Sequence, residues 1–156
     1  MSKIKQVKKE ANNVLDLSRD EDLVIGLMNL ISLEEHFFFT YVKTNDDKYL
    51  DLLNSVRDMR KEMLAKVVIN PVGEEWCISK HLLASSMRMM EVGTKELGRG
   101  KKEDSKKFFD SSFELFSLFF GLNNDLIKSK ITEKTKKESF SKLKNFVTDM
   151  VDCCKE

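Results

Sequence analysis

Apolar residues recur at the spacing of a helix face along almost the whole chain, and only one proline and six glycines interrupt the pattern. Proline breaks helices and glycine weakens them, so their scarcity permits long helices. No segment shows the sustained alternation of polar and apolar residues that marks a half-buried strand. The sequence therefore predicts an all-α protein.

The 156 residues fit one domain, and the pattern divides them into five or six helices. We expect a single-domain antiparallel helical bundle over residues 1–156, with a four-helix core at about 19–124. Amphipathic terminal helices are expected at about 3–17 and 135–152. The expected core helices cover about 19–44, 47–69, 71–98 and 103–122, with Ser18, Asp47 and Asn70 as N-terminal caps of the first three.

The expected helix at 19–44 is apolar around most of its circumference. Leu27, Ile31 and Phe38 fall at the centre of its apolar arc. The opposite side is a narrow polar stripe, made of Asn29, Ser32, His36, Thr40 and Lys43. Such a helix must be covered on several sides, either by the terminal helices or by another subunit, so we expect a homodimer.

Glu34 and Glu35 lie on the two flanks of the apolar arc, where an unpaired carboxylate would be costly. In the next expected helix, Arg60 falls inside the core face. A guanidinium can bind a carboxylate through two hydrogen bonds and stays charged when partly buried. We therefore expect Arg60 to pair with Glu34 or Glu35 across the helix interface.

The stretch from Glu74 to Glu91 concentrates chemically capable side chains. Ser79, Ser86 and Gly93 repeat every seven residues on the same expected helix and predict a seam where another helix approaches closely. The polar residues of this stretch could lie at the same height along the bundle as polar residues of the neighbouring helices. Together they would form either a ligand cleft or an ordinary ion-pair network. The candidate ligand-binding residues are Glu34, Glu35, His36, Arg60, Glu75, Trp76, His81 and Arg88.

A metal site is the alternative. Cys77 and His81 are four residues apart and so point from one face of a helix, and His36 could complete a ligand set for zinc or iron. We favour the other interpretation of this thiol and imidazole, which is that they pack under a neighbouring helix or face water. The paired Glu-x-x-His motifs of di-iron bundles are absent, and no other cofactor is predicted.

No catalytic residue is predicted. The chain has neither a G-x-S-x-G nucleophile motif nor a glycine-rich phosphate loop. Its formal net charge is +1, and the lysine-rich stretch at 128–137 has no interleaved aromatic residue, so we expect no nucleic-acid partner.

The expected location is the cytoplasm. The apolar run Leu23–Leu33 is too short to span a bilayer, and no secretory signal begins the sequence, so we expect no membrane association. Three cysteines are an odd number and imply no disulfide framework, which suits a reducing compartment.

We therefore expect a non-enzymatic interaction or ligand-binding module that self-associates, with a second copy or another protein as its partner. The alternative is a protein that depends on a metal or small ligand. Its site would combine Cys77, His81 and His36 with the Glu34/Glu35 pair.

Overall fold

A computed structural model of the protein describes residues 17–124 and 141–148. Four long helices occupy the first range, and residues 141–148 are also helical, with no strand in either range. The helices are α2 (Leu17–Thr44), α3 (Lys48–Leu64), α4 (Glu75–Gly98) and α5 (Lys102–Asn123). The predicted all-α class is confirmed. The expected helix at 3–17 and most of that at 135–152 lie outside the described residues.

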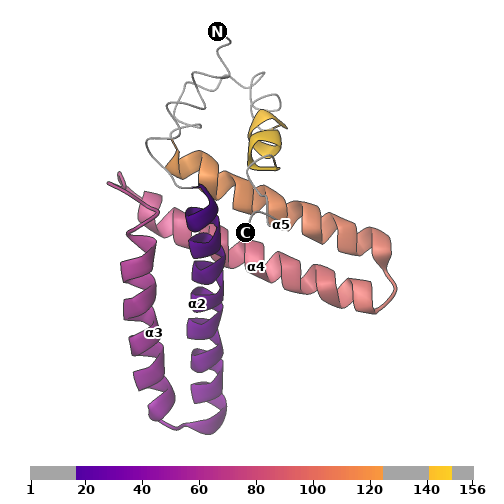
Figure 1. The fold of residues 1–156 in the computed structure, drawn as a ribbon. Coiled ribbons are helices and arrows are strands. Elements are labelled where there is room, and N and C mark those ends of the chain that lie inside the picture. The colour runs from indigo at the N-terminus through magenta and orange to yellow at the C-terminus, as the bar shows by residue number, and fades with distance from the viewer. Residues whose placement is uncertain (1–16, 125–140, 149–156) are drawn as a thin grey trace.

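The four helices form two hairpins that meet at an elbow (Figure 1). α2 packs against α3, α4 packs against α5, and the two hairpins meet chiefly where α2 crosses α4. From that crossing the α2/α3 hairpin and the α4/α5 hairpin extend in different directions (Figure 1). The expected four-helix antiparallel core within one chain is therefore not confirmed.

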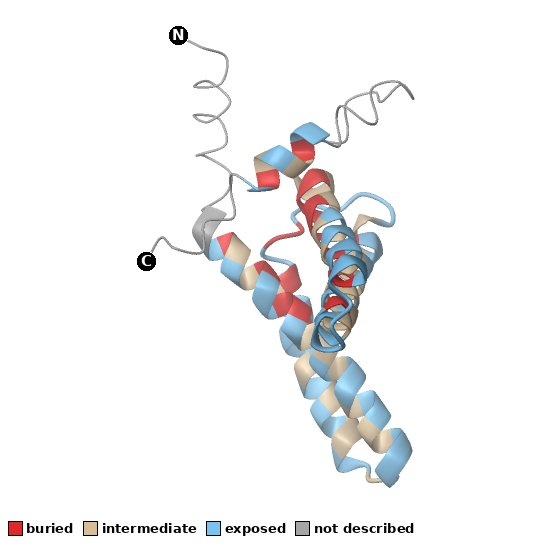
Figure 2. Ribbon diagram, turned by 90° about the vertical axis from the view of Figure 1, so that its right-hand side faces the viewer, coloured by how far each residue is buried: buried red, intermediate tan, exposed pale blue. Residues whose placement is uncertain are grey.

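The hydrophobic core lies at the junction of the hairpins (Figure 2). Its members come from the start of α2, the end of α3 and its following turn, the middle of α4, the end of α5, and the helical residues at 141–148. They include Val24, Leu27, Leu64, Val67, Val68, Leu83, Phe116, Phe119, Phe120, Leu143 and Val147. Away from the junction, no residue from Asn29 to Met59 is buried. One end of the α2/α3 hairpin is thus anchored in the core and the other projects from it.

The small-residue seam on α4 packs directly against α5, as the sequence predicts. Ser86 and Ser112 each donate a hydroxyl hydrogen bond to the other's backbone carbonyl, at 2.8 Å and 2.7 Å. Further along α4, the Ser105 hydroxyl donates to the Gly93 carbonyl at 2.8 Å. All four residues are buried, so these bonds form where water does not compete. The seam fixes the register of the α4/α5 hairpin.

The boundaries of two helices differ from those expected. α3 ends at Leu64 rather than near residue 69, because the backbone amides of Lys66 and Val67 donate to carbonyls three residues back, those of Met63 and Leu64, instead of four residues back. α4 begins at Glu75 rather than at Pro71. Between them Asn70 adopts a φ of 50°, in the left-handed region, and Glu74 rather than Asn70 directly precedes α4, so Asn70 does not cap that helix.

Two other expected caps also differ in detail. Ser18 lies inside α2, which already includes Leu17, and so does not stand before the helix. Asp47 does precede α3, but its side chain makes no capping hydrogen bond. In the same turn Asp46 accepts hydrogen bonds from Lys48, which lower the pKa of the Asp46 carboxyl below its ordinary value.

One described helix segment, Arg19–Thr44 of α2, is long and apolar enough to cross a membrane by length and composition. Core helices of water-soluble proteins and signal sequences meet the same two criteria. The absence of membrane association stays a prediction.

The close approach at Gly93 generates a stability prediction. A Cβ at Gly93 would lie 2.7 Å from two ring carbons of Phe109, closer than carbon atoms pack, so Gly93→Ala must push the helices apart or move the ring. We expect a loss of about 1 to 3 kcal/mol in the free energy of unfolding, measured by urea denaturation.

Gly26→Ala is the matched control, because Gly26 is also inside a helix and a Cβ added there would meet nothing within 4 Å. Removing a helical glycine at this position should stabilise the protein by about 0.5 to 1 kcal/mol. Equal effects of the two substitutions would contradict the close packing at the seam.

Candidate functional site

Glu34 and Glu35 pair with arginines from two different helices. Successive helix residues point about 100° apart, so Glu34 faces α3 while Glu35 faces α4. Arg60 of α3 donates two hydrogen bonds to Glu34, from Nε to Oε1 at 2.7 Å and from Nη2 to Oε2 at 3.1 Å. Arg60 is only 3% exposed. The expected buried pair is confirmed, and its carboxylate partner is Glu34.

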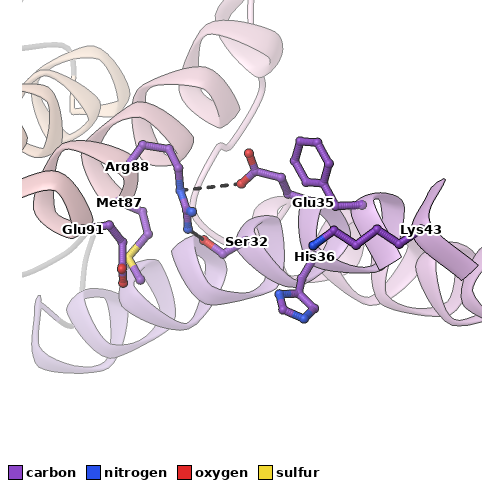
Figure 3. A pocket seen from close by; sticks show the side chains of 8 residues that line it. Ser32, Glu35, His36, Lys43, Met87, Arg88 and Glu91 are labelled. Carbon is purple, nitrogen blue, oxygen red and sulfur yellow. Dashed lines mark hydrogen bonds and ion pairs between the residues drawn. The ribbon is translucent and has the colours of Figure 1, made fainter. Parts of the chain in front are cut away.

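Glu35 makes the corresponding contact with α4. The Nε atom of Arg88 lies 3.5 Å from Glu35 Oε2, and Arg88 Nη2 donates a hydrogen bond of 2.9 Å to Ser32 Oγ (Figure 3). Both charged side chains are nearly half exposed, so this ion pair adds little stability. Its main effect is to hold the guanidinium of Arg88 against α2, at the inside of the elbow.

A pocket with a volume of about 480 Å³ opens beside this contact; we call it the elbow pocket. Residues at spacings of four, three and four along α2 share one helix face and form one wall. Three residues of α4 form the other. The lining residues are Ser32, Glu35, His36, Phe39 and Lys43 of α2, and Met87, Arg88 and Glu91 of α4.

The structure divides the predicted ligand-binding residues into three groups. Glu35, His36 and Arg88 line the elbow pocket, and Glu34 and Arg60 form the adjacent buried pair. The remaining three lie elsewhere on α4: the Glu75 carboxylate accepts a hydrogen bond from the Val72 backbone at 2.8 Å, Trp76 packs against the core, and His81 is exposed.

Five pocket residues are absent from the predicted ligand-binding set. Ser32 and Lys43 belong to the polar stripe of α2, and with His36 they are the part of that stripe that lines the pocket. Glu91 is the last residue of the stretch Glu74–Glu91, whose polar residues were expected near those of the neighbouring helices. Phe39 and Met87 carry no sequence signal for a site, because an apolar residue at helical spacing is typical of a core.

The expected metal ligands do not come together. Among residues 17–124 and 141–148, no group of three or more histidine, cysteine, aspartate or glutamate side chains could hold a metal ion. His36 lines the elbow pocket, whereas Cys77 and His81 are exposed and lie outside that pocket. The arrangement of these residues therefore gives the metal alternative no support.

Charged and polar side chains from both helices line the elbow pocket. Its one hydroxyl, Ser32 Oγ, accepts a hydrogen bond from Arg88. The charged side chains can recognise complementary charges on a ligand or a partner.

Comparisons of the chain with protein-family models, with curated proteins and with solved structures gave no match. Function is therefore inferred from the geometry of the fold and the elbow pocket.

The buried pair generates the second prediction. Arg60→Met leaves Glu34 partly buried without its partner, because the Glu34 side chain is only 16% exposed. We expect a loss of about 3 kcal/mol in the free energy of unfolding. Arg57→Met on the same helix is the control, because Arg57 is exposed and should change stability by no more than about 0.5 kcal/mol. Similar small losses for both variants would contradict the structural role of Arg60.

Proposed function

We propose that the protein is a non-enzymatic helical interaction module that self-associates through the projecting part of its α2/α3 hairpin. One observation supports this most directly. Val24, Ile31 and Phe38 are spaced by seven residues and so lie on one stripe of α2. Val24 is fully buried in the core, Ile31 is half-buried, and Phe38 is 49% exposed. Among the described residues, the apolar stripe continues beyond the part of α2 that is covered.

Further apolar side chains are exposed on the projecting part of the hairpin. They come from both helices: Leu33 and Val42 of α2, and Leu52 and Met59 of α3. Single exposed apolar residues are normal on a protein surface, but a concentration of them on one projection is typical of an interaction site. Burying these side chains supplies the driving force for association.

A second copy of the chain is the partner that we propose. Two copies related by a two-fold axis present the same stripe to each other, so one apolar surface serves both sides of the interface. Two antiparallel hairpins packed together make four antiparallel helices. This bundle of two α2/α3 hairpins would differ from the four-helix core expected at about 19–124 of a single chain. The net charge of +1 imposes little repulsion between copies.

We also propose that the protein works in the cytoplasm. Cys77 is an exposed free thiol, which suits a reducing compartment. The near-zero net charge gives no electrostatic reason to expect nucleic acid as the partner.

Phe38→Lys tests self-association. A charge in the centre of the proposed interface must be desolvated on dimerisation, so we expect the variant to be monomeric under conditions where the native protein is a dimer. Light scattering coupled to size-exclusion chromatography measures both masses. Because Phe38 is half exposed in one chain, the variant should keep the native helical circular-dichroism spectrum.

The matched control is Ile25→Lys. Ile25 is exposed to a similar extent, 43%, but lies about 140° around α2 from Phe38. This variant should remain a dimer. A native protein that is monomeric at high micromolar concentration would overturn the proposal.

A further inference from the structure

The elbow pocket has a recognition chemistry of its own, separate from the apolar stripe. Arg88 and Glu91 are three residues apart on α4, a spacing at which opposite charges commonly pair. Arg88 instead reaches across to Ser32 and Glu35 on α2. No ion pair or hydrogen bond joins the Glu91 side chain to another described residue, so its carboxylate is available at the pocket wall.

The opposite wall presents two more side chains without partners among the described residues, His36 and Lys43. Lys43 extends back along α2 toward His36, while Glu91 lies beyond Arg88 on the other side of the pocket (Figure 3). Arg88 stands between them, with its Nη1 donors unused by the contacts to Ser32 and Glu35. The pocket therefore offers positively charged hydrogen-bond donors, on Arg88 and Lys43, and a negatively charged acceptor, the Glu91 carboxylate.

The balance of these charges selects the class of ligand. Arg88 and Lys43 carry positive charges and Glu35 and Glu91 carry negative charges, so the formal charges of the lining cancel when His36 is neutral. A polyanion such as a nucleic acid would be repelled by the two carboxylates. A ligand that carries one charge of each sign can pair with both the positively and the negatively charged side chains of the pocket.

We propose that the elbow pocket binds a small dipolar ligand of the apolar α-amino acid class. Its carboxylate would bind Arg88 and Lys43, and its ammonium group would bind Glu91. Arg88 and Glu91 are neighbours on one helix face. The carboxylate and the ammonium group of an α-amino acid are attached to one carbon, so a single ligand could contact both residues. Phe39 and Met87 provide apolar surface for the ligand side chain. The volume of about 480 Å³ lies within the range of small-molecule pockets.

Two features of the pocket favour binding over a loose surface contact. Arg88 is already oriented by Ser32 and Glu35, so less side-chain freedom is lost when a carboxylate binds. The methionine side chain adapts its shape to different apolar groups at small cost, which suits a ligand class rather than one exact shape.

Isothermal titration calorimetry with four probes tests the proposal. L-leucine and L-phenylalanine carry both charges, N-acetyl-L-leucine lacks the ammonium group, and L-leucinamide lacks the carboxylate. We expect saturable binding of at least one of the two amino acids, and at least about tenfold weaker binding of both blocked derivatives, since each lost charge-assisted hydrogen bond is worth that much.

Variants locate the site. Glu91→Gln and Arg88→Met should each weaken binding of the amino acid by about tenfold or more. Lys95→Met and Glu103→Gln are the matched controls, because both residues are exposed and lie outside the elbow pocket. These two variants should bind as the native protein does. Retained helical circular dichroism in all four variants checks that the fold is intact.

Three results would overturn the proposal. One is the absence of saturable binding by either amino acid up to about 10 mM. Another is equal binding of leucine and its two blocked derivatives, which would exclude dipolar recognition. The third is unchanged binding in both Glu91→Gln and Arg88→Met, which would place any site elsewhere. None of these results bears on self-association, because Phe38 does not line the elbow pocket.

Discussion

The pairing of two neighbouring carboxylates with two arginines ties three helices together. Adjacent positions on a helix point in different directions, so Glu34 meets Arg60 on α3 while Glu35 meets Arg88 on α4. The first pair is buried and cannot lose one partner without leaving a desolvated charge. The second pair is half exposed, so it adds little stability and mainly orients the Arg88 guanidinium. Together they join the α2/α3 hairpin and the α2/α4 crossing to one short segment of α2.

The sequence predicts the features that depend on local periodicity. The all-α class, the Arg60 pair and the close seam at Ser79, Ser86 and Gly93 all follow from which residues share a helix face. Periodicity does not say what covers an apolar face. Phe38 lies on the same stripe as Leu27, yet Leu27 is fully buried and Phe38 is half exposed, because α4 crosses α2 and diverges from it. That crossing is a long-range property of the fold.

The candidate site was partly predictable for the same reason. Glu35, His36 and Arg88 carry charge or a titratable ring and stand out in the sequence. Phe39 and Met87 join the elbow pocket only because the crossing brings their helix faces together. The error at Asn70 is of another kind: a cap followed by proline is a common helix start, but Asn70 adopts a left-handed φ of 50° and α4 begins only at Glu75.

The absence of buried residues between Asn29 and Met59 divides the molecule into regions of unequal local stability. Amide hydrogens exchange through the least costly opening available to them, and a helix pair with few buried contacts can open without unfolding the core. In an isolated chain the far end of the α2/α3 hairpin should therefore lose its protection long before Leu83 or Phe119. A bound partner would slow exchange at the far end of the hairpin toward the rate of the core. The amide exchange rate of the hairpin therefore shows whether a partner is bound to it.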